Sequence, residues 1–416
     1  MARKYLYILM LILLSSCEKN KDVNENLLKF YGDALEDIGY SIAAAKTGFV
    51  IAGQLTDVSR PEPNYIEIRS SQRKMGLIRT GDDGNVIWQK SFGGRLPAVG
   101  TKAVELDDGS IVCVGHVIDT VTLLKDIFIV KTDGGGSVIL QKIYKTAGDV
   151  ANQYATDIIK TSDGFLILGV SDAFRAPDIE SAGNEAGKKD IYLMRINNSL
   201  ELIDDPRSFG FPGNDEGIAI KQDINSGYII VGTTDRSDKP ASEQDGNNIL
   251  LLRVNSQGKD IEHRIIGKTG NEYAADIEVL SDGYLVAGTW GNEGPEQRGY
   301  VWRMSANIFA PPLKEDKIEI KSSASTAVSF RINAVSRYKS NSFVMAGQSG
   351  SGSSARMLIF LTDNEGNLIT GKSVITGGTG SQTVNDVISD EGGNIYAVGK
   401  NSYESNSMIS LLKFRF

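Results

Sequence analysis

The sequence has 416 residues, a formal net charge of −8 and 45 glycines. No run of lysine and arginine could neutralise a phosphate backbone, which excludes nucleic acid as a partner. The many glycines are typical of a chain with many tight turns. Only two cysteines are present, Cys17 and Cys113. Because Cys113 lies within an apolar run, 111–114, we expect a buried free thiol and no disulfide.

The first residues have the features of an export signal. Two basic residues precede an apolar stretch, 5–14, that is too short to cross a bilayer. Residues 14–17, Leu-Ser-Ser-Cys, resemble the lipobox of bacterial lipoproteins. The resemblance implies removal of a signal peptide, 1–16, and attachment of acyl chains such as palmitate to Cys17. Residues 17–26 are then the lipidated cysteine and a polar, flexible tether. An ordinary secretory signal is the alternative.

A short apolar run that ends in glycine recurs seven times along the rest of the chain. The closing glycines follow one another at intervals of 52 to 63 residues and are Gly53, Gly115, Gly169, Gly232, Gly288, Gly347 and Gly399. A repeat of this length, read as four short strands, is the pattern of a β-propeller blade. We therefore predict an all-β protein, a seven-bladed β-propeller of four-stranded antiparallel blades.

The two ends of the repeat region complement each other. The seventh repeat stops after its third strand, 410–416, and the strand pattern that is missing there is found at 27–32. An N-terminal strand that completes the last blade closes the ring and protects two sheet edges. We expect a single propeller domain over 27–416, with 27–32 as the fourth strand of the last blade. An irregular stretch, 310–325, interrupts the fifth repeat and keeps an eight-bladed ring as the alternative.

The best copies of the repeat share a longer pattern. Asp-Ile, then Asp-Gly with an aromatic residue, then a closing glycine are found at 157–169 and at 276–288. Asp-Ile-Tyr and a cation follow at 190–195. This pattern resembles the roughly 60-residue propeller repeats of bacterial secreted proteins and lipoproteins. The resemblance implies a propeller in the cell envelope, but it implies no single activity and assigns no functional residue.

Three recurring polar features are interpreted as structural. Asp or Asn with Gly after the third strand, as at 80–85 and 362–367, predicts turns in which the polar side chain accepts backbone amides. Asp157, Asp276 and Asp386 occupy one position of alternate repeats and predict capped turns, with a lining of the channel mouth as the alternative. Cations that end the third strand predict a solvated sheet edge, at Arg79, Lys131, Arg195, Arg253, Arg303 and Lys413.

Function on a propeller is usually carried by its loops. The loops before the first strands share one face with the loops between second and third strands. This face holds the long insertions, at 54–73, 171–189, 233–247 and 289–298. Its acidic, amide and aromatic residues suit sugar hydroxyls or a cation. The candidate binding residues are Trp290, Tyr154, Tyr273, Asp215, Glu216, Asn271, Glu272 and Glu293.

The sequence gives no catalytic signature. His116 and His263 lie in non-adjacent repeats without ligands at metal-binding spacing, so we predict no metal site and no cofactor. No Gly-x-Ser-x-Gly nucleophile motif is found. The acidic loops could supply the two carboxylates that glycoside hydrolysis requires, but the sequence does not give the distance between them.

The expected function is that of a lipid-anchored, non-enzymatic binding or scaffold module. We expect a monomer at the outer membrane, on its periplasmic face or at the cell surface, that contacts the membrane through the lipid on Cys17. Its ligand would be a glycan or an envelope protein. A polysaccharide-active hydrolase or lyase using loop carboxylates is one alternative. An accessory subunit of an outer-membrane complex, marked by an apolar surface patch, is another.

Overall fold

The computed structural model describes most of the chain from Leu27 onwards. The described residues are 27–32, 36–57, 73–145, 151–173, 188–236, 246–259, 262–267, 270–321, 327–403 and 406–416. The predicted signal peptide, Cys17 and the tether lie outside these ranges, as does much of the insertions predicted at 54–73, 171–189 and 233–247.

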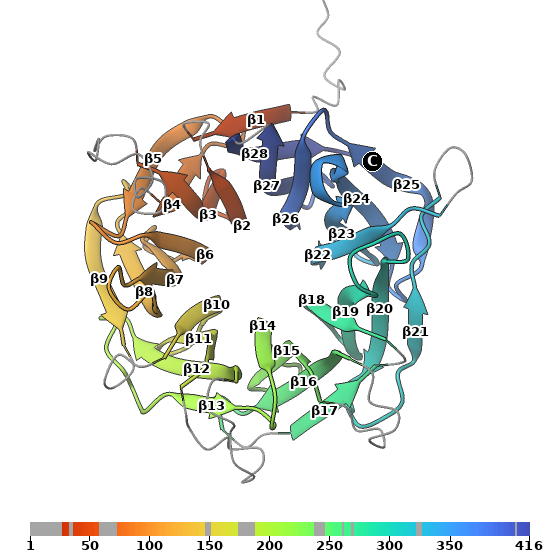
Figure 1. Cartoon of the computed structure of the whole chain (residues 1–416), viewed down its shortest axis with the longest axis horizontal. Helices are drawn as coiled ribbons and strands as arrows, with labels where there is room; N and C mark the ends of the chain where they lie inside the picture. The colour runs from red at the N-terminus through yellow and green to blue at the C-terminus, as the bar shows by residue number, and fades with distance from the viewer. Residues whose placement is uncertain are drawn as a thin grey trace, which may run out of the picture.

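The strands of the described residues form seven four-stranded antiparallel sheets, arranged as the blades of a ring (Figure 1). The inner strands of blades 1 to 7 are β2 (Ile38–Ala44), β6 (Ala98–Glu105), β10 (Gln153–Lys160), β14 (Asp215–Gln222), β18 (Glu272–Leu280), β22 (Phe330–Arg337) and β26 (Ser381–Ser389). The second strands are β3 (Phe49–Thr56), β7 (Ile111–Ile118), β11 (Gly164–Ser171), β15 (Tyr228–Thr234), β19 (Gly283–Trp290), β23 (Ser342–Ser349) and β27 (Ile395–Tyr403). The predicted seven-bladed propeller is confirmed.

The outer half of each blade consists of a third and a fourth strand. The third strands are β4 (Arg73–Thr80), β8 (Lys125–Thr132), β12 (Asp190–Asn197), β16 (Asn248–Val254), β20 (Arg298–Ser305), β24 (Arg356–Asp363) and β28 (Asn406–Phe414). The fourth strands are β5 (Val86–Phe92), β9 (Val138–Tyr144), β13 (Arg207–Phe209), β17 (Glu262–Ile266), β21 (Lys314–Lys317), β25 (Leu368–Thr376) and, for blade 7, β1 (Leu27–Tyr31). A 3-10 turn, η2 (Gly352–Ser354), follows β23.

Blade 7 is built from both ends of the chain, as the sequence predicted. β1 pairs antiparallel with β28, in a register that places Leu27 opposite Lys413 and Tyr31 opposite Ile409. A parallel bridge between Glu36 and Ser407 adds a second link between the chain ends. The irregular stretch of blade 5 is also resolved in favour of seven blades, because the short strand β21 pairs with β20 and completes that sheet.

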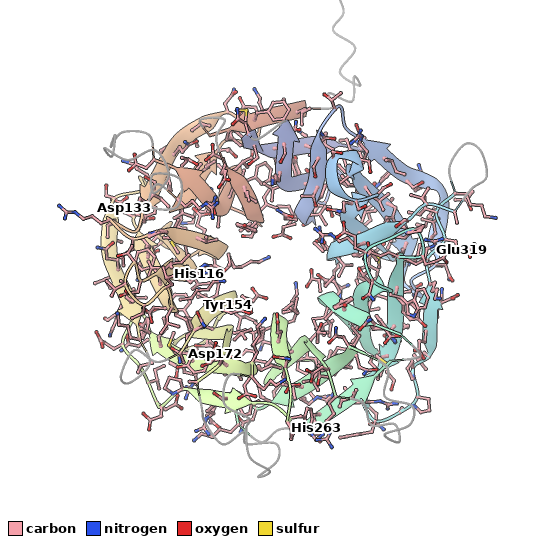
Figure 2. The ribbon with its side chains drawn as sticks, viewed as in Figure 1. His116, Asp133, Tyr154, Asp172, His263 and Glu319 are labelled. Carbon is pink, nitrogen blue, oxygen red and sulfur yellow. The ribbon has the colours of Figure 1, made fainter. Side chains whose placement is uncertain are left out.

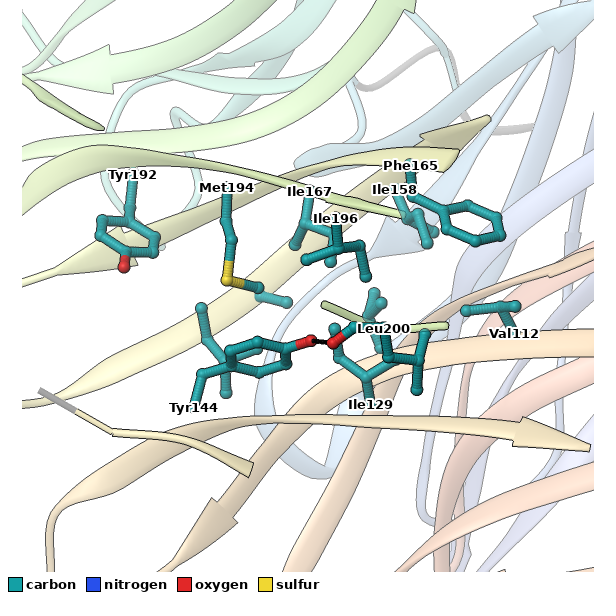
Figure 3. Packing of buried hydrophobic residues seen from close by; sticks show 13 residues of the cluster. Val112, Ile129, Tyr144, Ile158, Phe165, Ile167, Tyr192, Met194, Ile196 and Leu200 are labelled. Atoms are coloured by element: carbon teal, nitrogen blue, oxygen red, sulfur yellow. Dashed lines mark hydrogen bonds between the residues drawn. The ribbon is translucent and has the colours of Figure 1, made fainter. Parts of the chain in front are cut away.

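The hydrophobic core lies between neighbouring blades. Second and third strands are covered on both faces, which explains why they read as continuous apolar runs rather than alternating ones. Between blades 2 and 3, Val112, Ile129 and Tyr144 pack against residues of β11 and β12 (Figure 3). The Tyr144 hydroxyl donates to the Leu200 carbonyl, so the polar end of this buried ring is satisfied across the blade interface.

Every inner strand carries a β-bulge, and the type of residue that follows the bulge alternates from blade to blade. From blade 1 to blade 7 these residues are Ser41, Lys102, Asp157, Ala219, Asp276, Ala334 and Asp386. Carboxylates in blades 3, 5 and 7 therefore alternate with small residues in blades 4, 6 and 1. Blade 2 breaks the alternation with a lysine.

Each of these three carboxylates joins its blade to the next. Asp157 accepts the amide of Ile158 at 2.8 Å and that of Ile220, in blade 4, at 3.0 Å. Asp386 likewise accepts the amide of Ile42, in blade 1, at 3.1 Å. Asp276 does the same between blades 5 and 6. The three residues thus lie at mid-strand bulges, not in the capped turns expected at the strand starts.

Two of the six cations at the ends of the third strands, Arg79 and Arg303, are buried and do not form the solvated edge that the sequence suggested, whereas the other four are half-buried. The Arg79 and Arg303 side chains are 8% and 2% exposed, and they pair with Glu105 at 3.4 Å and with Asp282 at 2.6 Å. The interpretation was wrong because the third strand is not an outer strand. In blade 1 it is paired on both sides, and the buried cations Arg79 and Arg303 each have a carboxylate partner.

The predicted turns after the third strands are confirmed. Asp363 Oδ1 accepts the amides of Glu365 and Asn367 at 3.0 and 2.8 Å. Gly366, with φ of 79°, adopts the left-handed conformation that the turn requires. Asp133, Asn197 and Asn255 form the same turn in their blades.

Candidate functional site

The ends of the second strands and the starts of the inner strands define one face of the ring, here called the insertion face. All eight predicted binding residues lie on or near this face, spread over blades 3, 4 and 5. The structure does not gather them into one site. Their surroundings differ enough that they are best described in four groups.

Asn271 belongs to a recurring link between blades. Its side-chain oxygen accepts the amide of Asn247, from blade 4, at 2.8 Å, and its side-chain nitrogen donates to Asn292 at 3.0 Å. Asn152 and Asn214 make the corresponding contacts in blades 3 and 4. The amide that the sequence offered as a ligand contact is therefore engaged in holding blades together, and its role toward a ligand stays a prediction.

Asp215 and Glu272 begin the inner strands of blades 4 and 5 and are fully buried. Asp215 accepts the amide of Phe211 at 2.7 Å and packs beside Asp190 over Gly210. Burial, reinforced by the charge of Asp190, raises the pKa of Asp215 to about 7, although the Phe211 hydrogen bond opposes this shift. Glu272 occupies the same place over Gly267.

The predicted aromatic residues have polar neighbours. The Tyr273 hydroxyl donates to Asn292 at 3.1 Å, and the Lys317 ammonium lies 3.0 Å from the centroid of the Trp290 ring. Glu293 is exposed. The cation occupies one face of the Trp290 indole, where a sugar ring would otherwise stack. Whether these side chains contact a ligand stays a prediction.

Tyr154 lines a small cavity of about 200 Å³ between blades 2 and 3. The Lys125 ammonium lies 4.9 Å from the centroid of the Tyr154 ring. Glu216 borders the same region through its ion pair with Lys189, at 2.5 Å. The lining residues within the described ranges are Lys125, Asn152, Tyr154, Val170, Asp172 and Lys189.

A larger cavity, of about 560 Å³, opens between blades 1 and 7. We call it the seam cavity, because it lies where the two ends of the chain close the ring. Blade 1 contributes its inner, second and third strands, blade 7 contributes the same three strands, and one residue comes from η2. The lining residues are Glu36, Ile38, Tyr40, Gln54, Arg73, Ser353, Gly380, Ser381, Lys400, Ser402, Asn406 and Ser407.

The charges of the seam cavity do not cancel. Arg73 donates to Glu36 through its Nε at 2.9 Å, so this carboxylate is already neutralised. Lys400 also lines the cavity, and its ammonium has no hydrogen-bond or ion-pair partner among the described residues. Tyr40 and Arg73 both line the cavity, where burial raises the pKa of Tyr40 and the charge of Arg73 partly offsets that rise. The described lining therefore carries one uncompensated positive charge.

A second group of charges converges on the axis of the ring. Lys102 pairs with Asp386 at 2.8 Å, and Lys221 lies 3.9 Å from Asp276 and 3.5 Å from Glu278. Burial lowers the pKa of Lys102, but the carboxylates of Asp386, Asp157 and Asp276 outweigh it, and the pKa is raised. These lysines balance the carboxylates that join the blades, so the axial charges form part of the framework.

The described residues form no catalytic constellation. Figure 2 shows His116 beside Tyr154 and His263 at the outer side of the ring, far from each other. Burial lowers the pKa of His116 to about 3, so it stays neutral at physiological pH. No group of three or more histidine, cysteine or acidic residues within the described ranges could hold a metal ion. None of the helices in these ranges is long and apolar enough to cross a bilayer.

Sequence reasoning missed the residues of the seam cavity. Glu36 and Tyr40 lie near the start of the propeller region, whereas Lys400 lies in the seventh repeat. None of the three belongs to a sequence motif. A usable signal was present, because the predicted closure already placed blades 1 and 7 side by side. Arg73, the last residue of the first insertion, then faces the blade 7 strands across that junction.

The chain matches no known protein family and no curated protein. Solved structures with a similar course of the chain are found. The β-propeller domain of the Trilobed protease from Pyrococcus furiosus aligns with a TM-score of 0.47 at 10% identity, over 92% of this chain and 94% of that one. Acylaminoacyl peptidase from Pyrococcus horikoshii aligns with a TM-score of 0.45 at 11% identity, over 90% of this chain and 50% of that one.

Trypanosoma rangeli sialidase in complex with the inhibitor DANA aligns with a TM-score of 0.45 at 10% identity, over 81% of this chain and 57% of that one. The chain spans about half the length of the peptidase and sialidase chains. These similarities concern the course of the backbone and assign no activity to this protein.

Proposed function

We propose that this protein is a lipid-anchored binding module of the cell envelope, and that its ligand occupies the seam cavity. The observation that carries the proposal is the cavity itself, an opening of about 560 Å³ on the face that also bears the loop insertions. Its size is within the range of small-molecule sites. The Lys125–Lys189 cavity beside Tyr154 is less than half as large.

The chemistry of the lining favours a carbohydrate. Most of its side chains are hydroxyls and amides, which donate to and accept from sugar hydroxyls without carrying charge. Tyr40 adds an aromatic ring with a polar end, a common partner for sugars at wet sites. The uncompensated ammonium of Lys400 favours a ligand with one anionic group. An acidic oligosaccharide, in which a uronate carboxylate lies among several hydroxyls, combines these requirements.

Binding without hydrolysis is supported by the carboxylates. Glycoside hydrolysis uses two carboxyl groups roughly 5 to 10 Å apart on either side of the scissile bond. The described lining of the seam cavity supplies one, Glu36, and Arg73 holds it as an ion pair. Hydrolysis needs a second carboxyl group as general acid, and the described lining of the seam cavity offers none.

The lipid anchor and the envelope location rest on the sequence. Cys17 ends a lipobox-like motif, and ten positions separate it from Leu27, the first residue of β1. We propose that acyl chains on Cys17 hold the propeller at the outer membrane, where a short tether places the seam cavity near envelope polysaccharides.

Isothermal titration of the full chain in detergent tests the ligand. The probes are a tetramer of galacturonate and a neutral tetrasaccharide of glucose, with reducing ends assayed in the same samples. The acidic tetramer should bind, and no reducing ends should be released. Lys400→Gln should weaken binding by about tenfold or more, since a hydrogen bond to a charged group contributes about 1.5–3 kcal/mol. Lys372→Gln, on the outer strand β25, is the matched control and should have no effect.

Each outcome decides a part of the proposal. Equal binding of both sugars, unchanged in Lys400→Gln, retains the binding module and removes the anionic requirement. Release of reducing ends establishes a hydrolase instead. Failure of both sugars to bind contradicts the carbohydrate ligand and directs the search to an envelope protein.

A further inference from the structure

The exposed apolar side chains are concentrated on one side of the ring. Eight of the 15 large apolar residues that are exposed within the described ranges lie on the outer strands β1, β5 and β9. The outer strands of the other four blades, β13, β17, β21 and β25, together carry one, Ile375. The eight are Leu28, Phe30, Val86, Ile87, Val138, Ile139, Leu140 and Ile143. We call these three strands the apolar rim.

The apolar rim extends without interruption over three neighbouring blades. Its strands close blades 7, 1 and 2, which follow one another, and Figure 1 shows β1, β5 and β9 along the same side of the molecule. Contiguous apolar surface on a soluble domain usually marks a contact with a partner or a membrane. Here its edges are also the free edges of three sheets.

The polar residues of the apolar rim have one sign of charge. The strands read Leu-Leu-Lys-Phe-Tyr, Val-Ile-Trp-Gln-Lys-Ser-Phe and Val-Ile-Leu-Gln-Lys-Ile-Tyr, each with one lysine and none with an acidic residue. The whole chain is acidic, with a net charge of −8, so this local excess of cations is a distinct feature. Lys142 pairs with Glu201 at 2.6 Å, and Lys29 donates to Asn85 at 2.9 Å.

Aliphatic side chains flanked by lysine and by tryptophan or tyrosine are the composition of a membrane–water interface. The aliphatic groups enter the boundary of the acyl chains, the aromatic rings lie at the headgroups, and the ammonium groups contact anionic phosphates. A protein interface is more often enriched in arginine and depleted in lysine. The composition of the apolar rim therefore favours a lipid surface.

The position of the apolar rim relative to the anchor gives a second, independent reason. β1 belongs to the rim and is also the first strand after Cys17. Ten residues span at most about 36 Å even when fully extended, so a lipid on Cys17 would keep this side of the ring close to the bilayer. A weak apolar contact is then strengthened by the high local concentration that the tether imposes.

We infer that the propeller stands on its edge on the membrane, with β1, β5 and β9 resting in the interface. The inference rests on the proposed lipid anchor and adds an orientation to it. In this orientation neither face of the ring is covered by the bilayer, and the seam cavity opens beside the membrane, where blade 7 meets blade 1.

Trp88, on β5, is a probe already placed in the apolar rim, where its indole donates to the Gly134 carbonyl at 2.9 Å. The full lipidated chain is reconstituted with vesicles of phosphatidylglycerol and phosphatidylcholine that carry brominated acyl chains. Flotation with the vesicles shows whether the lipid anchors the protein. The part of the bromine quenching that disappears in Trp88→Phe shows whether the apolar rim contacts the acyl chains. We expect flotation, and at least a twofold loss of the emission that belongs to Trp88.

Two surface variants separate the rim from general effects. Ile87→Asn with Ile139→Asn changes side chains that are 59% and 50% exposed, so folding is retained while quenching of Trp88 should fall by half or more. Phe309→Asn is the matched control, since this side chain is 57% exposed and lies in blade 5, away from the rim. It should leave the quenching unchanged.

The outcomes distinguish the two proposals. Flotation without quenching of Trp88 retains the anchor and overturns the edge-on contact. Absence of flotation overturns both. Trp88 emission that depends on protein concentration, but not on bromination of the lipid, shows that a second copy of the chain covers the rim and also overturns the inference.

Discussion

Replacing Asp386 by alanine should destabilise the closed ring more than the removal of an ordinary surface charge. Its carboxylate accepts the amides of Val387 at 2.9 Å and of Ile42 at 3.1 Å, and it pairs with the Lys102 ammonium at 2.8 Å. The first contact lies within blade 7, the second reaches blade 1, and the third reaches blade 2. One side chain therefore joins three blades at the junction of the chain ends.

The magnitude follows from what the substitution leaves behind. Breaking a buried ion pair by removing one partner costs about 3–5 kcal/mol, because the other charge stays without a partner. The Lys102 side chain is 34% exposed, so water screens part of this penalty and the lower end applies. The two amides lose the same acceptor, which raises the total above this lower end, although losses within one hydrogen-bond and ion-pair network do not add in full. We expect a loss of about 3–5 kcal/mol in the free energy of unfolding.

Differential scanning calorimetry of the full chain measures this loss. An unfolding entropy of about 2.1 cal/mol/K per residue gives roughly 0.8 kcal/mol per degree for residues 27–416, so the Tm should fall by about 4–6 °C. Asp386→Asn keeps one acceptor oxygen and should lose less. Asp157→Ala removes the same two kinds of amide contact without a direct lysine pair and should fall between them. A Tm change below about 1 °C in Asp386→Ala would refute the idea that these carboxylates hold the blades together.

Three further predictions concern single buried groups. Because the pKa of Asp215 is raised to about 7 in the folded protein, its contribution to stability is complete below about pH 4 and lost as the pH rises through 7. Asp215→Asn should remove that part of the pH dependence of the Tm, and an unchanged profile would contradict the assignment. Gly210→Ala should destabilise by about 1–3 kcal/mol in urea denaturation, because its Cβ would lie 2.1 Å from Asp190 Oδ1. Gly378→Ala, with open space around it, is the neutral control. Burial raises the pKa of Cys113, so Ellman's reagent should label it only after unfolding, and rapid labelling of the native protein would show that the site opens.

The sequence contained most of the fold because each blade repeats a local pattern. A glycine after an apolar strand and an Asx turn with a left-handed glycine are decided by neighbouring residues, so both could be predicted and both are confirmed. The closure by β1 was predictable because the seventh repeat lacks a fourth strand. These features need no knowledge of which blades touch.

The features that the sequence did not reveal depend on contacts between blades. Arg303 has the same sequence context as a solvated cation, and only the cover supplied by neighbouring strands makes it buried. The surroundings of the candidate site residues depend on contacts between blades in the same way. The predicted acids Asp215 and Glu272 are the first residues of inner strands, where the preceding blade encloses them. Tyr40 and Lys400 approach each other only after the ring has closed.

The alternation of carboxylates and small residues after the bulges limits which blades can be removed from the ring or added to it. A blade with a carboxylate needs a following blade with a small residue, so the working unit is a pair of blades: 3 with 4, 5 with 6, and 7 with 1. Three such pairs account for six of the seven blades. The remaining blade, blade 2, belongs to no pair and carries Lys102 at this position. Deleting any one of blades 4 to 7 would set carboxylate against carboxylate or small against small. Deleting a pair, or blade 2 alone, would leave the alternation intact, so a shortened ring built from this chain should lose a whole pair or blade 2.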